Sequence, residues 1–278
     1  MQGHIQESIT CTNFGNGACV KSKMDKSNGL NSNDIEKIKN ECNRKNKILV
    51  SNDIRTKSTC QPGIYAVLFD LDGVLIDSGK DIMNAVNWAL EQDGLASLSY
   101  ETIKAHIGNG AKELIENCYK EFGEDKLQLA VSALPKYKKY YLDHSVIETY
   151  LYDGVIEGLE KIKSLKMAIV TNKTGVLADQ ILTILGIRSY FGCIISPESV
   201  SKLKPNPEGL LLAMKMMQVN AEETVMVGDS WSDIEAGKSA GVRTIGAFWG
   251  LGNRTELENA SPSWNAESFS EAVNQLIV

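Results

Sequence analysis

The sequence predicts an α/β fold: a Rossmann-like parallel sheet core with helices on both faces and an inserted helical cap domain. Three observations lead to this prediction. Short apolar runs alternate with longer amphipathic stretches from residue 64 onward, one long interval between two such runs is mainly helical in pattern, and polar residues directly follow several of the runs. Strands that alternate with helices form parallel sheets, because each crossover helix packs back onto the sheet.

The expected strands are short and almost wholly apolar, which is typical of strands buried on both faces. They lie in the segments "YAVLF", "KMAIVT", "CIIS", "TVMVGD" and "RTIGAF". Between them, apolar residues recur at helical spacing in "GVIEGLEKIKSL", "GVLADQILTILG", "NPEGLLLAMKMMQ" and "DIEAGKSAG". We therefore assign residues 63–77 and 153–278 to the α/β core.

The interval between the first two strands breaks this alternation. Helical patterns occupy most of residues 78–152, and we expect Pro135 to kink or split the last helix of the interval. In open parallel sheets, ligands bind outside the carboxyl ends of the strands. A helical domain inserted at that edge would cover the binding site as a lid.

The first 62 residues differ in composition from the rest, because they are rich in Lys, Asn and Ser and poor in large apolar side chains. We expect a polar, disordered tail with one short helix from Asp34, and we favour this over a targeting presequence, since acidic residues interrupt the segment. The cysteine spacing in the tail matches no CxxC pattern, so reduced thiols are favoured over a zinc site. The cysteines concerned are Cys11, Cys19, Cys42 and Cys60.

Size and charge exclude several classes of function. The chain has 278 residues, a net charge of −6 and 43 % hydrophobic residues, enough for one large domain or two modest ones. The sequence has no stripe of basic residues, so nucleic acid is not expected as a partner. No apolar run approaches the roughly 20 residues that span a bilayer, so no membrane partner is expected and the predicted location is cytoplasmic. The sequence makes no prediction of oligomeric state.

Polar residues of unusual kind stand at the ends of three expected strands and in one loop. Each has a simpler interpretation: an Asp after a strand often caps a helix, a Thr-Asn pair forms turns, and a lysine is often solvated. Their joint occurrence in this order favours a single site at the carboxyl edge of the sheet. The residues are Asp70, Asp72, Thr171, Asn172, Lys204, Asp229 and Asp233.

These residue types indicate phosphoryl transfer. Two carboxylates two positions apart repel each other unless a cation lies between them, and Mg²⁺ prefers such oxygen ligands. A carboxylate can attack phosphorus and form an acyl phosphate, and a second one can protonate the leaving oxygen and later activate water. Thr171 can donate to a phosphate oxygen, and Lys204 can stabilise the charge that develops there.

Four segments resemble the motifs of the haloacid dehalogenase-like phosphatases: "DLDGV", "VTNK", "KPNP" and "GDSWSD". The likeness extends from about Ile64 to the C-terminus and includes a helical cap in the family's C1 position. The segments "IGNG", "YLYDGVIEGLEKIKS" and "TNK" are further similar to phosphoglycolate phosphatases and their pyrophosphatase relatives.

The resemblance implies a role for each site residue. Asp70 would be the nucleophile and Asp72 the general acid and base. Asp70, the backbone carbonyl of Asp72, and Asp229 would hold Mg²⁺, with Asp233 supporting the metal site. Thr171, Asn172 and Lys204 would bind the phosphate, and residues 73–78 would form a mobile turn that opens and closes the cap. Family members that dehalogenate or cleave carbon–phosphorus bonds lack the second aspartate, so its presence favours a phosphate ester or anhydride.

Substrate specificity is expected to reside in the cap. Gly108, Asn109 and Gly110 precede a helix that begins near Ala111, where free backbone N–H groups attract anions. Asn109 is the main candidate contact and Lys112 a weaker one, since a first-turn lysine opposes the helix dipole and can point to solvent. The alternative is that this glycine-rich segment is only a flexible turn.

The predicted function is Mg²⁺-dependent hydrolysis of a small-molecule phosphate monoester through an aspartyl-phosphate intermediate, with phosphoglycolate favoured. The alternatives are a pyrophosphatase, a sugar-phosphate phosphatase or a phosphomutase of the same family. A mutase cap should contact a second phosphate with cations, and the cap contains no clear arginine for this. A non-catalytic binding protein on the same fold is less favoured, because every expected catalytic residue is intact.

Overall fold

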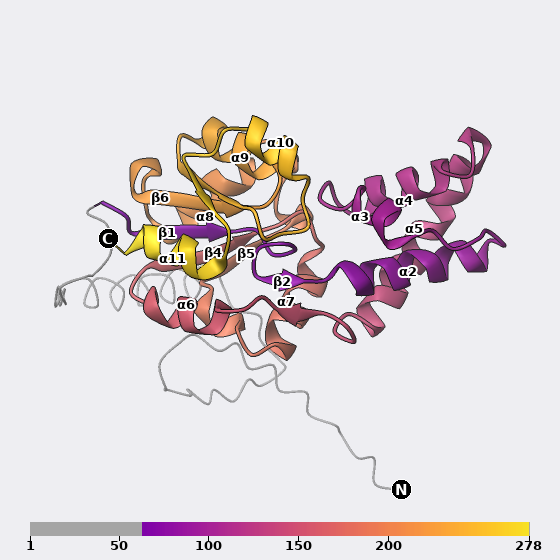
Figure 1. The fold of residues 1–278 in the computed structure, drawn as a ribbon, viewed down its shortest axis with the longest axis horizontal. Coiled ribbons are helices and arrows are strands. Elements are labelled where there is room, and N and C mark those ends of the chain that lie inside the picture. Colours follow the sequence, from indigo (N-terminus) through magenta and orange to yellow (C-terminus); the bar gives the residue numbers. More distant parts are fainter. Residues whose placement is uncertain (1–62, 278) are drawn as a thin grey trace, which may run out of the picture. The chain divides into compact units, whose positions relative to one another are not determined.

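The computed structural model describes residues 63–277, and a six-stranded parallel sheet forms the core of this region (Figure 1). The strand order is β5-β4-β1-β6-β7-β8, and all neighbouring pairs are parallel, which confirms the predicted fold class. The edge strand β8 was not among the predicted strands. The strands are β1 (Ala66–Phe69), β4 (Lys166–Val170), β5 (Cys193–Ile195), β6 (Thr224–Gly228), β7 (Arg243–Ala247) and β8 (Trp264–Ala266).

Helices cover both faces of the sheet, because side chains alternate between the faces along each strand. Val67 and Phe69 of β1 pack with residues of α6, α7 and α11, whereas Ala66 and Leu68 pack with residues of α8 and α9. Two apolar cores therefore enclose the central strands. The helices are α6 (Val155–Lys161), α7 (Gly175–Ile184), α8 (Glu208–Met217), α9 (Trp231–Ala240), α10 (Arg254–Asn259) and α11 (Phe269–Leu276).

A separate block of helices follows β1, as the sequence predicted for the cap (Figure 1). It contains α2 (Gly79–Gln92), α3 (Tyr100–Lys104), α4 (Ala111–Lys120) and α5 (Leu127–Asp143). Two short strands, β2 (Ile76–Asp77) and β3 (Tyr150–Leu151), pair antiparallel where the chain enters and leaves the block. The predicted boundaries at residues 78 and 152 thus fall beside this pair, and movement of the block as a lid stays a prediction.

Helix α5 corrects one expectation. It runs continuously from Leu127 to Asp143 with Pro135 inside it, so the expected split is wrong. Proline removes one helical hydrogen bond. Helix α5 packs against both α2 and α4, and its buried residues lie on both sides of Pro135, so tertiary contacts stabilise the helix across the proline. Short 3-10 helices occupy Glu124–Lys126, Arg188–Tyr190, Pro197–Ser199 and Ala221–Glu223.

The predicted polar tail lies outside the described residues, together with its expected helix from Asp34 and its four cysteines. Within the described part of the chain, Cys118 and Cys193 are buried free thiols. Among residues 63–277, no helix combines the length and the apolar character needed to cross a membrane.

Candidate active site

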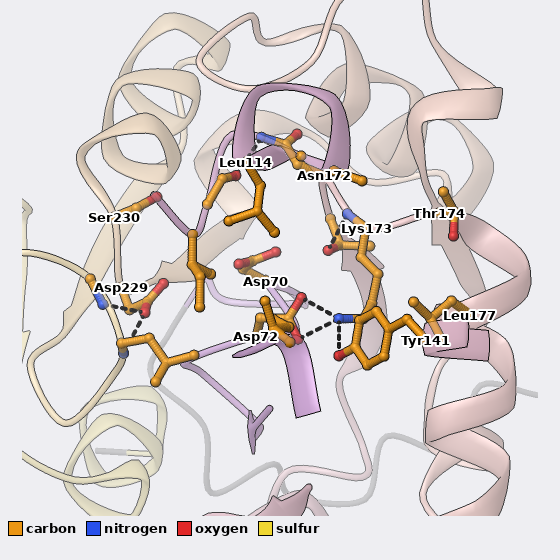
Figure 2. Close-up of a pocket in the computed structure, with 18 of the residues that line it drawn as sticks. Asp70, Asp72, Leu114, Tyr141, Asn172, Lys173, Thr174, Leu177, Asp229 and Ser230 are labelled. Carbon is orange, nitrogen blue, oxygen red and sulfur yellow. Dashed lines mark hydrogen bonds and ion pairs between the residues drawn. The ribbon is translucent and has the colours of Figure 1, made fainter. Parts of the chain in front are cut away.

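The predicted site residues converge at the carboxyl edge of the sheet. Asp70 follows β1, Thr171 follows β4 and Asp229 follows β6, and these three strands are neighbours in the sheet. Because parallel strands end at the same edge, their following residues meet there. A small cavity of about 80 Å³ opens between this edge and the helical block, and Asp70, Asp72 and Asp229 are among the residues that line it (Figure 2).

Lys204 lies in the loop before α8, and its side chain contacts Asp70. Its Nζ is 2.8 Å from Asp70 Oδ1 and 2.6 Å from Asp233 Oδ1, and it donates to the carbonyl oxygen of Val170 at 2.8 Å. Burial lowers the pKa of Lys204, but the charges of Asp233 and Asp70 outweigh this and raise it, so the side chain stays an ammonium.

Asp70 is held in a form that suits a nucleophile. Burial raises the pKa of Asp70, Lys204 lowers it, and Asp233 raises it again, to about 6 in total. The side chain is only 13 % exposed, yet it borders the cavity. Near neutral pH the carboxylate is therefore ionised, weakly hydrated and accessible to a ligand in the cavity.

Asp233 has two roles. Its Oδ2 accepts from the backbone N–H of Ser230 at 3.1 Å and from the Ser230 hydroxyl at 2.6 Å, which forms a capping box at the start of α9. Its Oδ1 is a buried oxygen that forms an ion pair with Lys204 Nζ at 2.6 Å and has no other partner among the described residues. The simpler interpretation of Asp233 as a local cap thus accounts for one oxygen and leaves the other facing the site.

Asp229 is not a helix cap, because Ser230 is the N-cap of α9. Its Oδ2 accepts from the backbone N–H groups of Leu251 at 2.8 Å and Gly252 at 2.9 Å. Burial and the charges of Asp233 and Asp70 raise the pKa of Asp229 well above its usual range. The hydrogen bonds from Leu251 and Gly252 therefore orient the Asp229 carboxylate, which has no cationic partner among the described residues.

Glycines allow the chain to approach Asp229 closely. A Cβ at Gly73, which has a φ of +81°, would lie 1.8 Å from Asp229 Oδ2, and a Cβ at Gly250 would lie 2.4 Å from Asp229 Cβ. Any larger residue at either position would displace this carboxylate.

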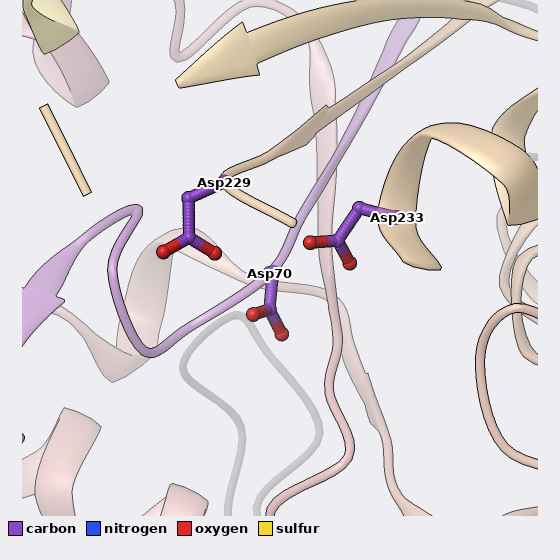
Figure 3. A group of neighbouring side chains, drawn as sticks. All are labelled: Asp70, Asp229 and Asp233. Atoms are coloured by element: carbon purple, nitrogen blue, oxygen red, sulfur yellow. The ribbon is translucent and has the colours of Figure 1, made fainter. Parts of the chain in front are cut away.

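Oxygen atoms of Asp70, Asp229 and Asp233 lie within 4.8 Å of one another and could hold a metal ion (Figure 3). Around them, four carboxyl groups, including Asp72, face only two buried lysines, so acidic groups outnumber the cations that pair with them. A cluster of carboxylate oxygens in which acidic groups outnumber the buried lysines fits a hard divalent cation.

Asp72 belongs to a network that the sequence did not predict. Lys173 Nζ lies 2.9 and 3.0 Å from the two carboxylate oxygens of Asp72 and donates to the Tyr141 hydroxyl at 2.9 Å (Figure 2). The Ser78 hydroxyl also donates to Asp72. Lys173 directly follows the predicted pair at residues 171 and 172, so its place in the sequence was the available signal. The direction of its side chain was not readable from the sequence.

Thr171 and Asn172 occupy different positions in the site. The Thr171 hydroxyl oxygen accepts from the Lys173 N–H at 3.1 Å and borders the cavity, so the hydroxyl proton can point at a ligand. The Asn172 side-chain amide instead accepts from the Lys204 N–H at 3.2 Å and donates to the Gly108 carbonyl at 3.0 Å. The Asn172 side chain thus links the lysine loop to the cap turn, and only its backbone N–H is left for phosphate.

The cap turn contributes less than expected. Gly108 and Gly110 line the cavity. The Asn109 amide donates to Glu113 at 2.8 Å, and Lys112 pairs with Glu116 at 3.8 Å, and neither side chain lines the cavity. Helical spacing explains this, since residues four apart meet on one face of α4. Substrate contact by Asn109 and Lys112 stays a prediction, and their side chains would have to leave these partners to make it.

Comparison with known proteins identifies the family. The model of the haloacid dehalogenase-like hydrolases matches residues 67–247. The chain belongs to this family. Phosphoglycolate phosphatases of Colwellia psychrerythraea and Aquifex aeolicus are 37 % and 36 % identical to it over 219 and 210 residues, which cover 76 % and 74 % of this chain and 96 % and 94 % of the relatives.

Solved structures agree with this assignment. A predicted phosphoglycolate phosphatase of Haemophilus somnus superposes with a TM-score of 0.71 at 27 % identity, covering 77 % of this chain and 98 % of that protein. A haloacid dehalogenase-like hydrolase of Streptococcus pneumoniae gives 0.68 at 26 % identity, covering 76 % and 98 %. The family and the phosphatase class that the motifs predicted are confirmed, whereas the substrate, the metal and the role of each residue stay predictions.

Proposed function

We propose that this haloacid dehalogenase-like phosphatase hydrolyses a small phosphate monoester, with phosphoglycolate as the favoured substrate. The observation that supports the chemistry best is the placement of Asp70 at the cavity, with a buried ammonium on one side and a second carboxylate, Asp72, two residues away. The curated relatives named phosphoglycolate phosphatase support the choice of substrate.

In the first half of the proposed reaction, the carboxylate of Asp70 attacks phosphorus while the bond from phosphorus to the ester oxygen breaks. Asp72 gives a proton to the leaving oxygen, so the alcohol departs neutral. The product on the enzyme is an aspartyl phosphate at Asp70. Lys204 and the Thr171 hydroxyl stabilise the phosphate oxygens as their charge shifts.

In the second half, Asp72 takes a proton from water, and the resulting hydroxide attacks the phosphorus of the aspartyl phosphate. The bond from phosphorus to Asp70 breaks, which restores the carboxylate and releases inorganic phosphate. Asp72 therefore acts first as an acid and then as a base, and one complete cycle returns both carboxyl groups to their starting states.

Mg²⁺ is the proposed cofactor, and it would offset the negative charge of the phosphate and of the carboxylate cluster. Asp70, the backbone carbonyl of Asp72, and Asp229 would hold it, with Asp233 as support. We also propose that residues 63–77 and 153–278 act as the core and residues 78–152 as a cap, so that residues 73–78 form the turn on which the cap moves. A cap that closes would exclude water before the acyl phosphate forms.

The experiment is a measurement of phosphate release from a panel of small esters, with Mg²⁺ or with a chelator. Phosphoglycolate should be hydrolysed fastest among phosphoglycolate, ethyl phosphate, glucose 6-phosphate and pyrophosphate, and chelation should abolish the activity. The matched control is Asp70→Asn, which keeps the shape of the side chain. Hydrolysis that survives in folded Asp70→Asn would refute the nucleophile, and fastest turnover of pyrophosphate would refute the substrate.

A further inference from the structure

Lys173 is a buried cation for which the proposed phosphate chemistry provides no task. Its side chain is 5 % exposed and lines the cavity. The phosphate end of the site already has Lys204, which is enclosed by Asp70, Asp233 and the Val170 carbonyl. A second buried ammonium is costly to desolvate, so its presence at the cavity calls for an explanation beyond charge balance.

The position of Lys173 places it beside the leaving group. Asp72 is the proposed proton donor to the ester oxygen, and Lys173 Nζ is within 3.0 Å of both carboxylate oxygens of Asp72. Atoms bonded to the leaving oxygen therefore come within a few ångströms of Lys173. In the view of Figure 2, Lys173 and Asp229 lie on opposite sides of Asp70, so Lys173 lies away from the proposed metal ligand Asp229.

Lys173 also has a donor to spare. An ammonium has three N–H bonds. The two oxygens of Asp72 lie at 2.9 and 3.0 Å from the same nitrogen and can share one of them, and the Tyr141 hydroxyl accepts a second at 2.9 Å. The third N–H remains for a ligand, and the fixed partners hold the nitrogen in place without a change of rotamer.

The rest of the cavity lining is mainly apolar, with Ile82, Leu114 and Leu177 among its residues. Among the described residues that line the cavity, Lys173 and the exposed Lys138 are the lysines, and no arginine is present. An anionic group in this apolar surrounding would thus find one buried cation to bind.

We propose that Lys173 is a specificity-determining residue that binds an anionic substituent on the carbon next to the ester oxygen, such as the carboxylate of phosphoglycolate. This inference rests on the proposed function and deepens it, because it names the substrate class by chemistry: small phosphate monoesters whose leaving alcohol carries a carboxylate. Tyr141, from the cap helix α5, orients the ammonium for that contact.

The test compares phosphoglycolate with ethyl phosphate, which has a methyl group in place of the carboxylate. The readout is the ratio of kcat/KM for the two esters, since a disturbed Asp72 lowers both values and cancels in the ratio. The full-length wild type should prefer phosphoglycolate, and Lys173→Met should reduce that preference roughly 10- to 100-fold, as expected for a lost charged hydrogen bond. Lys173→Arg, which keeps the positive charge, should retain part of the preference for phosphoglycolate. The control Lys138→Met should change the ratio less than about threefold, because exposed charges contribute little.

The outcomes separate the two proposals. A preference that survives in Lys173→Met overturns the role of Lys173 while the proposed function stands. A ratio near one in the wild type overturns both the role of Lys173 and the choice of phosphoglycolate as substrate, while hydrolysis of small phosphate monoesters stands. If Lys138→Met abolishes the preference instead, the exposed Lys138 binds the anionic substituent, and the role proposed for Lys173 is likewise overturned. Release of phosphate from neither ester refutes the proposed function itself. The ratio measured for the wild type does not depend on whether any variant folds. Thermal melting of each variant shows whether that variant is folded before its ratio is interpreted.

Discussion

Removing the proposed Mg²⁺ should destabilise the folded protein more strongly as the pH rises. Burial raises the pKa of Asp70 from 3.8 to about 6, so the metal-free folded chain binds more protons than the unfolded chain between those values. The corresponding stability is present below about pH 4 and is lost as the pH rises through about 6. The shift corresponds to about 3 kcal/mol, and the raised pKa of Asp229 acts in the same direction.

A bound cation would stabilise the ionised carboxylates and reverse this loss. We therefore expect Mg²⁺ to raise the melting temperature by about 10 °C near pH 7.5 and by much less near pH 5, where protons compete for the same oxygens. The assay is thermal unfolding followed by circular dichroism, with Mg²⁺ or with a chelator, at both pH values. An equal rise at both pH values, or none near pH 7.5, would refute the reasoning.

Asp229→Asn is the matched control for this experiment. The amide oxygen can still accept from the N–H groups of Leu251 and Gly252, so the local structure is kept while one negative charge is removed. The variant should melt higher than the wild type without metal near pH 7.5, and Mg²⁺ should barely raise it further. A full response to Mg²⁺ in Asp229→Asn would exclude Asp229 as a ligand.

Three further changes test other parts of the site. Asp70→Asn should lower kcat at least about 10³-fold while circular dichroism stays unchanged, and rapid turnover by this variant would exclude an aspartyl phosphate at Asp70. Gly250→Ala, whose Cβ would lie 2.4 Å from Asp229 Cβ, should raise the Mg²⁺ concentration for half-maximal activity about 10- to 100-fold, and an unshifted Mg²⁺ titration would contradict the close-approach argument. Removal of residues 1–62 should leave kcat/KM within about twofold, since the proposed residues all lie between 70 and 233, and loss of activity in a folded truncation would show that this segment completes the site.

The core of the site was predictable because its geometry follows from the topology. A parallel sheet brings the residues after β1, β4 and β6 to one edge, so the strand ends alone indicated that Asp70, Thr171 and Asp229 meet. The apolar strand runs were equally informative, since a strand buried on both faces carries few polar residues. The edge strand β8 has the sequence "WNA", which is too short and too polar to show this pattern.

The contacts between cap and core were not predictable, because they depend on side-chain directions set by tertiary packing. The segment "TNK" does not show that the Asn172 amide reaches the Gly108 carbonyl, or that Lys173 reaches Tyr141 across a long sequence separation. The hydrogen bond from the Asn109 amide to Glu113, one helical turn away, was equally unreadable, and substrate contact by this turn stays a prediction. Pro135 failed as a helix breaker because packing outweighed a single lost hydrogen bond.

Lys173 joins the helical block to Asp72, the proposed acid–base group, and this has a consequence for the proposed specificity. Lys173 contacts Asp72, which comes from the segment after β1, and Tyr141, which comes from α5. Asn172, its neighbour in sequence, joins the Lys204 loop to the cap turn at Gly108. A displacement of the cap would therefore remove a partner from Lys173 and a hydrogen bond from Asn172 together. The residue proposed to select the leaving alcohol and the residue proposed to protonate it thus form one hydrogen-bonded unit, so we expect a poorly fitting substrate to lose kcat as well as affinity.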